Sequence, residues 1–217
     1  MPVTRWSEKF YESTRGRIIH LLRRSGATVD QLARALGLTN NAVRVHLATL
    51  ERDGIIEQRT AEPTGAVGKP AYRYRIAPDV EPLFSHAYAP VLDQLLDVLT
   101  EHMSPDQVDS VMQAVGQRLA AARAIPAGDT RARAEGATRV LGELGGIAQL
   151  EEHDGTLTIR GASCPVSSTV RNHPEVCRAV EALVAELVGA PVQQHCEHSD
   201  RPRCCFEIHN TARSTDR

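Results

Sequence analysis

Residues 28–56, TVDQLARALGLTNNAVRVHLATLERDGII, contain the pattern that decides the fold of the N-terminal part of the chain. Thr28 and Gln31 have the spacing of a capping box, which predicts that a helix begins just after Thr28. Thr39 is a preferred N-cap residue, and it predicts a second helix over residues 40–52. Two short helices joined by a tight turn are typical of a helix-turn-helix.

The flanking segments extend this pattern to a complete winged domain. Residues 15–24 carry apolar side chains at helical spacing and predict a preceding helix. Residues 55–59 and 71–76 favour two strands, and the Gly- and Pro-rich segment 63–70 between them predicts a loop. We therefore expect a winged helix-turn-helix over residues 1–78.

The predicted helix 40–52 has one face for packing and another for contact with a partner. Val43, Leu47 and Leu50 recur at i, i+4 and i+7, so they should pack on the preceding helices. On the other face Arg can hydrogen-bond guanine, Asn can hydrogen-bond adenine, and Val can contact a thymine methyl group. The helix start and the wing should meet phosphates. The predicted DNA contacts are Thr39, Asn40, Asn41, Arg44, Val45, Arg59, Lys69 and Arg73.

Charge is distributed unevenly along the chain. Residues 1–78 contain 13 Lys and Arg against 7 Asp and Glu, whereas residues 79–217 contain 12 against 20. A basic N-terminal part favours a polyanionic partner, which we expect to be a double-stranded DNA operator. The alternatives are chance clustering of solvated charges and a helical module for protein interaction.

The middle of the chain predicts a helical segment over residues 79–125. Apolar residues recur at helical spacing from Leu83 to about Met103, and Ser104 begins a second helix that runs to about Ala124. A helical pair between two domains often forms a homodimer contact, so we expect this segment to join two copies of the chain. The alternative is that these helices pack within their own chain.

The remaining sequence predicts a small α+β domain over residues 126–210. We expect a helix at 131–144, short helices between 164 and 187, and a disordered tail at 211–217. Strands are expected at 147–152, 156–160, 191–195 and 204–208. The predicted fold class is α+β, with a winged helix-turn-helix, central dimerisation helices and a C-terminal sensor domain.

All five cysteines lie in this last part of the chain, at Cys164, Cys177, Cys196, Cys204 and Cys205. They include no CxxC pair, which argues against a zinc ribbon or a thioredoxin-like site. Clustered thiols indicate a metal or iron–sulfur site, buried free thiols, or a redox switch. Cys164 is expected to open a helix, whose positive end would favour the thiolate.

Several motifs together resemble a known family of regulators. The run AVRVHL at 42–47, the run LERDGII at 50–56 and the run GKPAYRY at 68–74 resemble the ArsR/DeoR-like winged-helix regulators. Cys164-Pro165, the run HPEVC at 173–177 and the run RCCFEI at 203–208 resemble the SufR-type branch. That branch consists of iron–sulfur regulators that repress iron–sulfur assembly or stress genes.

This resemblance implies a function and a ligand set. It implies a repressor that responds to redox state or iron through a 4Fe–4S or 2Fe–2S cluster. Cys164 and Cys177 match the first two cluster ligands of the family, and Cys196 fits the third. Cys204, with Cys205 as the alternate, would supply the fourth, although the gap before Cys196 is longer than in the family. His or carboxylate ligation in the stretch 195–200 stays open.

Other functions are also weighed from the sequence. The same winged-helix regulator with a bound zinc ion, with thiols that oxidise, or with a small-molecule pocket is the alternative function. We expect no enzyme, because no orienting group accompanies Cys164 and a nearby His. The beginning of the chain has no apolar leader and the apolar stretches are short, which predicts a cytoplasmic protein without membrane contact.

Overall fold

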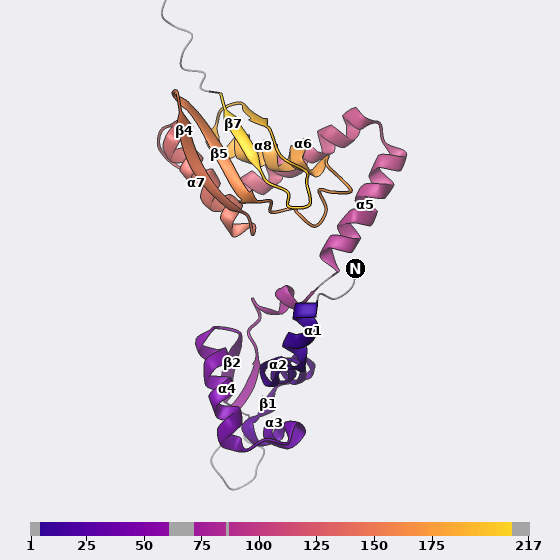
Figure 1. Ribbon diagram of the computed structural model, residues 1–217, viewed down its shortest axis with the longest axis vertical. Helices are drawn as coiled ribbons and strands as arrows, with labels where there is room; N and C mark the ends of the chain where they lie inside the picture. The colour runs from indigo at the N-terminus through magenta and orange to yellow at the C-terminus, as the bar shows by residue number, and fades with distance from the viewer. Residues whose placement is uncertain (1–4, 61–71, 86, 210–217) are drawn as a thin grey trace, which may run out of the picture. The chain divides into compact units, whose positions relative to one another are not determined.

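The computed structural model describes residues 5–60, 72–85 and 87–209 (Figure 1). The chain divides into two compact units, residues 1–86 and 87–217, and each is described by itself. In the described part of the chain, no helix combines the length and the apolar character that a membrane span requires. The predicted disordered tail, 211–217, lies outside the described residues.

The N-terminal unit combines four helices with a small antiparallel sheet among its described residues. Its strand order is β1-β3-β2. The elements are α1 Arg5–Glu12, α2 Thr14–Arg24, β1 Ala27–Thr28, α3 Val29–Leu36, α4 Asn40–Arg52, β2 Ile56–Thr60, β3 Tyr72–Ile76 and the short 3-10 helix η1 Glu81–Phe84.

Local hydrogen bonds define α3 as the sequence predicts. The hydroxyl of Thr28 accepts from the backbone N–H of Gln31 at 3.3 Å, and the Gln31 side chain accepts from the backbone N–H of Thr28 at 2.9 Å. Gly37 then ends α3 with a φ of 69°, a left-handed conformation that glycine adopts without a steric penalty. The winged helix-turn-helix prediction is confirmed, with a core that includes Ile18, Leu32 and Leu47.

Three elements of this unit were not predicted. The short helix η1 stands where the helix expected from Leu83 should begin, and α5 begins only at Tyr88. Helix α1 precedes the predicted first helix, and the two-residue strand β1 adds an edge to the wing by pairing with β3. The pairing joins Ala27 to Tyr74 and Thr28 to Arg73. A strand this short has no periodicity of its own, so only the partner strand reveals it.

The C-terminal unit is a four-stranded antiparallel sheet with helices. Its strand order is β4-β5-β7-β6. The elements are α5 Tyr88–His102, α6 Pro105–Ala121, α7 Thr130–Glu143, β4 Ile147–His153, β5 Thr156–Ser163, α8 Val176–Val188, β6 Val192–Gln194 and β7 Cys205–Ile208.

Helices α7 and α8 lie on one face of this sheet (Figure 1). Ile159 of β5 and Phe206 and Ile208 of β7 point to that face and are fully buried. Since successive residues of a strand point to opposite faces, Arg160 and Cys205 point to the other face. The sheet therefore separates a buried side from a solvent-facing side, and this separation decides where each thiol lies.

Helix α6 belongs to the same core. Val108, Met112 and Ala120 are buried there, and Gly116 lets α6 approach α8 closely. A Cβ at Gly116 would lie 2.3 Å from the carbonyl oxygen of Ala179, so only glycine fits this crossing. The predicted segment 79–125 is thus divided, because residues up to 86 group with the N-terminal unit and α5 and α6 group with the C-terminal unit.

Two details of the C-terminal prediction are wrong. Residues 165–172 form turns, and a single helix, α8, follows in place of several short helices. Cys164 therefore does not open a helix, whereas Cys177 lies in the first turn of α8. Pro174 explains the late start, because the residue before a proline is disfavoured in helical conformation.

Candidate functional site

Helix α4 has a buried apolar face and, opposite to it, an exposed face that is mostly polar. The Thr39 hydroxyl caps the helix by accepting from the backbone N–H of Ala42 at 3.2 Å. Val43, Leu47 and Leu50 are buried, as predicted. Asn41, Arg44 and Val45 are exposed, and Val45 keeps 61% of its surface accessible although it is apolar. An exposed helix face of this composition is typical of the helices that helix-turn-helix proteins place in a DNA major groove.

Most of the remaining predicted DNA contacts already make hydrogen bonds or ion pairs within the chain. The Asn40 side-chain amide donates to Asp30 at 2.6 Å. Arg59 pairs with Glu57 at 3.3 Å, and Arg73 donates to the carbonyl oxygen of Gly26. Lys69 lies outside the described residues.

Glu57 forms ion pairs with two arginines of the wing, Arg59 and Arg75. The hydrogen bond from Arg75 is the largest cause that lowers the pKa of Glu57. Arg59 lowers that pKa further. Because both pairs are exposed, phosphate can compete for Arg59 and Arg75 at little cost.

The fold brings four thiols together on the buried side of the sheet. Cys164 follows β5, Cys177 is in α8, Cys196 follows β6, and Cys204 precedes β7. Neighbouring thiols shift one another's pKa, which orders the four in a row with Cys164 next to Cys204, Cys204 next to Cys196, and Cys196 next to Cys177. Cys205, the alternate fourth ligand, is not a member of this row. We call the four residues the thiol row.

Neighbouring thiols shift each other's pKa in opposite directions along the thiol row. Hydrogen bonds from Cys177 and then Cys204 lower the pKa of Cys196, and a hydrogen bond from Cys204 lowers the pKa of Cys164. The pKa values of Cys177 and Cys204 are raised, first because their protons are held in these bonds and then by burial. The row therefore contains two groups that favour the thiolate form, which is the form that ligates metals.

The donor chemistry of the thiol row fits an iron–sulfur cluster, because cysteine thiolates are the usual ligands of such clusters. The arrangement is not that of a single-ion site. Across residues 5–60, 72–85 and 87–209, no group of three or more His, Cys, Asp or Glu side chains has the geometry to hold one metal ion.

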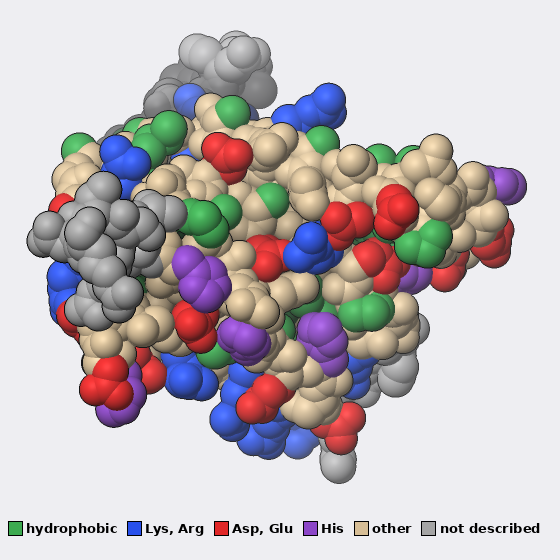
Figure 2. All heavy atoms as spheres, turned by 90° about the horizontal axis from the view of Figure 1, so that it is seen from above, with side chains coloured by type: hydrophobic (Ala, Val, Ile, Leu, Met, Phe, Trp, Pro, Cys, Tyr) green, Lys and Arg blue, Asp and Glu red, His purple; other side chains and the backbone are tan. Residues whose placement is uncertain are grey.

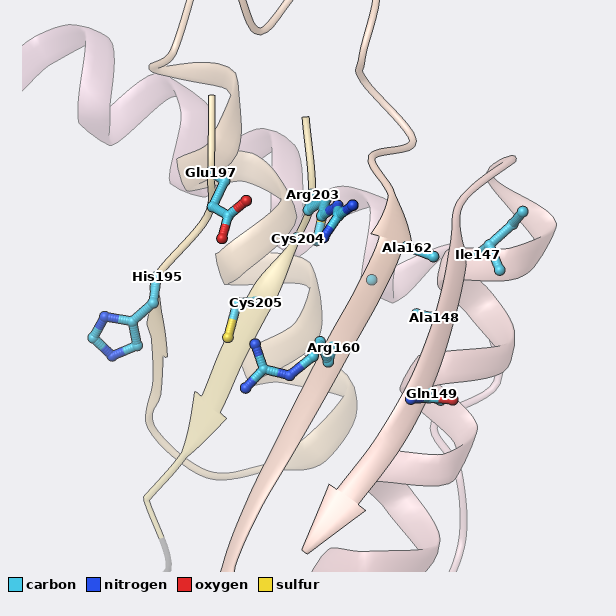
Figure 3. Close-up of a pocket in the computed structure, with 11 residues that line it drawn as sticks. Ile147, Ala148, Gln149, Arg160, Ala162, His195, Glu197, Arg203, Cys204 and Cys205 are labelled. Atoms are coloured by element: carbon cyan, nitrogen blue, oxygen red, sulfur yellow. The ribbon is translucent and has the colours of Figure 1, made fainter. Parts of the chain in front are cut away.

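Cys205 lies on the opposite side of the sheet. Its side chain points into a hollow of ≈ 360 Å³ that Arg160, His195 and Arg203 also line (Figure 3). Burial raises the pKa of Cys205. Only its backbone reaches the thiol row, where its N–H donates to the sulfur of Cys196 at 3.4 Å.

An imidazole lies at one end of the thiol row. The Nε2 atom of His198 is 3.3 Å from the sulfur of Cys177. His198 belongs to the acidic, His-rich stretch 195–200 that the sequence marked as unusual, although no spacing rule identified which histidine reaches the thiols.

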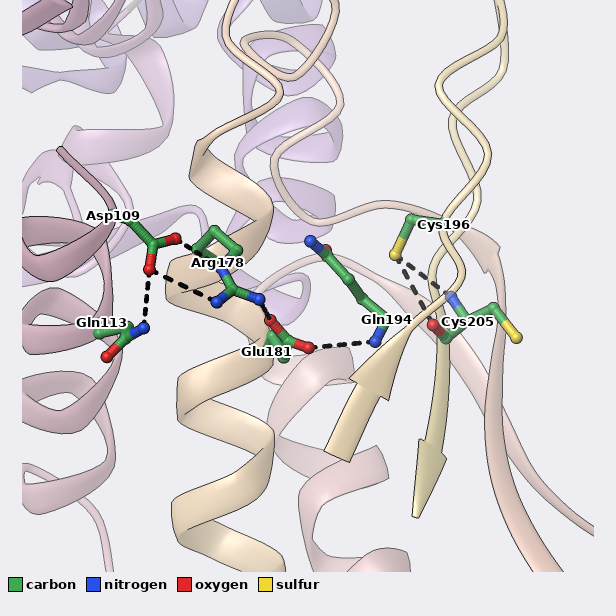
Figure 4. A network of polar contacts seen from close by, with 7 residues as sticks. All are labelled: Asp109, Gln113, Arg178, Glu181, Gln194, Cys196 and Cys205. Carbon is green, nitrogen blue, oxygen red and sulfur yellow. Dashed lines mark hydrogen bonds and ion pairs between the residues drawn. The ribbon is translucent and has the colours of Figure 1, made fainter. Parts of the chain in front are cut away.

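A polar network close to the thiol row in the chain joins α8 to α6 and to β6, and sequence reasoning missed it. Arg178 in α8 donates to Asp109 in α6 at 2.5 Å and also pairs with Glu181 (Figure 4). Glu181 in turn accepts from the backbone N–H of Gln194 at 3.1 Å. Arg178 directly follows Cys177 and Gln194 lies two residues before Cys196, so the network anchors the two segments that carry these thiols.

A second polar contact reaches α5. His173 is 5% exposed; its Nδ1 lies 3.0 Å from Glu175 and its Nε2 lies 3.5 Å from Asp97 in α5. His173 belongs to the segment between Cys164 and Cys177. This segment is therefore tied to α5 by a buried side chain.

The surface in Figure 2 is mixed in charge. Histidine side chains lie near the middle of the view among acidic and basic neighbours, and basic side chains gather at its lower edge.

Comparisons with known proteins support the assignment of the N-terminal unit. Residues 12–59 match the family described as "Helix-turn-helix domain". Comparison with curated proteins gives no match.

Several solved structures resemble part of the chain. Reduced HlyU from Vibrio cholerae is 23% identical, with a TM-score of 0.28 over 36% of this chain and 76% of that one. A ZitR variant from Lactococcus lactis is 19% identical, with a TM-score of 0.28 over 42% and 74%. MepR from S. aureus in its DNA-binding conformation is 18% identical, with a TM-score of 0.30 over 54% and 86%.

Likenesses at these TM-scores carry no weight on function. The family match and the geometry of α3 and α4 agree with each other. The N-terminal unit is a helix-turn-helix domain of the kind that DNA-binding transcription regulators carry.

Proposed function

We propose that this chain is a homodimeric transcription repressor that binds an operator through α4 and senses iron or redox state through an iron–sulfur cluster at the thiol row. The observation that carries the sensing part is the convergence of Cys164, Cys177, Cys196 and Cys204, which are spread over 41 positions of the sequence. The observation that carries the DNA-binding part is the exposed outer face of α4.

Arg44 is the residue that we expect to read a base. It is exposed near the start of α4, and an Arg that binds guanine in two places contributes about 1–3 kcal/mol of discrimination. Arg44→Ala should therefore weaken operator binding roughly 10-fold or more while binding to unrelated DNA changes little. Arg118→Ala, an exposed arginine of α6, is the control that should leave both affinities unchanged. Equal losses for operator and unrelated DNA would contradict base reading by Arg44.

The central helices supply a surface for the second copy. Tyr88, Val91, Leu95 and Val98 follow one side of α5 at i, i+3, i+7 and i+10, and each is at least half exposed. A dimer is expected because helix-turn-helix proteins read two half-sites about 34 Å apart. Leu95→Glu should convert the dimer to a monomer in sedimentation experiments; a monomeric wild-type chain would contradict the proposal.

Cys164, Cys177 and Cys196 are proposed as cluster ligands, with Cys204 as the fourth candidate from the sequence. A bound iron–sulfur cluster would supply sensitivity to electrons, oxygen and iron supply. The protein would exclude solvent around the cluster, because Cys164 and Cys177 are buried among apolar side chains.

The contact between His173 and Asp97 supports a route from the thiol row to DNA. Helix α5 follows the DNA-binding unit in the chain, so a shift of the segment between Cys164 and Cys177 would reposition α5. A coupling free energy of about 1–3 kcal/mol between cluster and operator is expected for such a link.

The test is iron and sulfide analysis with a visible absorption spectrum of protein purified without oxygen. Wild-type protein should be coloured and contain iron and sulfide in matching amounts, and Cys164→Ser and Cys177→Ser should lose both. Cys205→Ser is the matched control, because Cys205 adjoins Cys204 but faces the hollow on the other side of the sheet. A colourless wild-type protein after reconstitution would transfer the sensing role to zinc, thiol oxidation or a small ligand.

A further inference from the structure

Four charged side chains share the outer face of the wing strands β2 and β3. The strands pair with Glu57 opposite Arg75 and with Arg59 opposite Arg73. Side chains alternate along a strand, and the preceding Ile56 is buried in the core of the unit, so Glu57 and its three arginine neighbours point away from that core. This face therefore carries three guanidinium groups and one carboxylate.

The arginines of this face have too little negative charge around them. Arg59 lies directly opposite Arg73, and like charges in that position destabilise a sheet. Arg73 donates to the neutral carbonyl oxygen of Gly26, so Glu57 is the one charged partner that the described residues give to any of the three arginines. An anion over this face would relieve the repulsion, and the backbone of DNA supplies such anions.

Glu57 occupies the place of such an anion. Its carboxylate lies 3.3 Å from the Nε atom of Arg59 and also accepts a hydrogen bond from Arg75. Carboxylate and phosphate oxygens bind a guanidinium group in the same way, so both cannot use the same N–H groups at once. The three side chains are between 30% and 61% exposed, so DNA can reach both ion pairs.

We propose that Glu57 sets the selectivity of the chain for its operator by competing with DNA phosphates for Arg59 and Arg75. This inference rests on the proposed operator binding through α4. In a loose complex with unrelated DNA the phosphates have no fixed position, and the carboxylate, held opposite Arg75 by the strand register, keeps both arginines. On the operator, base contacts of α4 fix the phosphates, and the arginines change partner. The competing carboxylate thus weakens the wrong complex more than the right one.

Binding to an operator and to an unrelated duplex of equal length, measured over a range of salt concentrations, tests this inference. The operator is the sequence that the wild-type chain selects from a random duplex pool. Glu57→Gln should bind unrelated DNA more tightly at low salt, through up to two additional phosphate contacts. Its affinity for unrelated DNA should then fall about 10-fold more than that of wild type between about 50 and 200 mM salt. Operator affinity should change less, so the ratio of the two affinities falls.

Two further variants separate this mechanism from a general effect of charge. Glu151→Gln is the matched control, because Glu151 makes a comparable exposed ion pair with Arg160 at 3.0 Å in the C-terminal unit. It should leave both affinities and their salt dependence unchanged. In a chain that already carries Arg59→Gln and Arg75→Gln, Glu57→Gln should add no phosphate contact, because no competition remains.

The outcomes distinguish this inference from the function on which it rests. The exposed ion pairs of Glu57 contribute little to folding, so Glu57→Gln should stay folded. Equal tightening on operator and unrelated DNA, or a salt dependence like that of wild type, would overturn the inference and leave operator binding by α4 standing. Tightening that persists without Arg59 and Arg75 would overturn it as well. A wild-type chain that selects no operator would overturn both.

Discussion

Replacing Gly116 with alanine should destabilise the C-terminal unit. The added Cβ would lie 2.3 Å from the carbonyl oxygen of Ala179, 2.7 Å from the Cβ of Ala182 and 2.9 Å from the backbone nitrogen of Leu183. These atoms belong to the backbone or adjoin it, so no side chain can rotate away and α6 must move off α8. Overpacking of this kind costs about 1–3 kcal/mol.

Helix propensity alone would make the Gly116→Ala substitution stabilising, so the sign of the measured change tells whether the clash with α8 outweighs it. Alanine is better than glycine in a helix interior by about 0.5–1 kcal/mol, so the expected net loss is about 1–2 kcal/mol. Gly142→Ala in α7 is the matched control, because a Cβ there meets nothing within 4 Å. That variant should gain up to about 1 kcal/mol.

Urea unfolding followed by circular dichroism measures both variants. Residues 116 and 142 both belong to the C-terminal unit, so the N-terminal unit should unfold with the same midpoint in both variants. A stabilising Gly116→Ala, equal in size to Gly142→Ala, would refute the argument that α6 and α8 are in contact through their backbones.

Three further predictions concern capping, acid stability and signal transfer. Thr39→Ala removes the cap of α4 and should cost about 1 kcal/mol in unfolding of the N-terminal unit. Arg178 lowers the pKa of Asp109, so this carboxylate stabilises the fold above its ordinary pKa and loses that effect as the pH falls through the lowered value. The stability difference between wild type and Asp109→Asn should therefore shrink on acidification from pH 5 to pH 3. His173→Gln should keep iron and sulfide but reduce the effect of the cluster on operator affinity; unchanged coupling would exclude this route.

Local patterns explain which parts of the fold could be predicted. The caps at Thr28 and Thr39 and the buried face of α4 depend on residues three to seven positions apart, and the sequence displays them directly. Strand β1 and the turns at 165–172 depend on partners elsewhere in the chain or on proline geometry. Spacing alone could not identify them.

The candidate site also combines features that the sequence displays locally with features that depend on distant parts of the chain. The cysteines were recognised by residue type and by a family resemblance, but their order in the row depends on how β5, α8 and β7 meet. The bond between Arg178 and Asp109 spans 69 positions, and the contact between His173 and Asp97 spans 76. No periodicity in the sequence reports contacts at that range.

The neighbouring pair Cys204-Cys205 has a consequence for how β7 finds its register during folding. A slip of one residue turns every side chain of a strand to the other face. Such a slip would replace the inward thiol of Cys204 with that of Cys205, so the inward face would still present a sulfur atom. Phe206 and Ile208, both buried in the correct register, would be turned out to water. The burial of Phe206 and Ile208, and not the position of the sulfur atoms, therefore selects the correct register of β7.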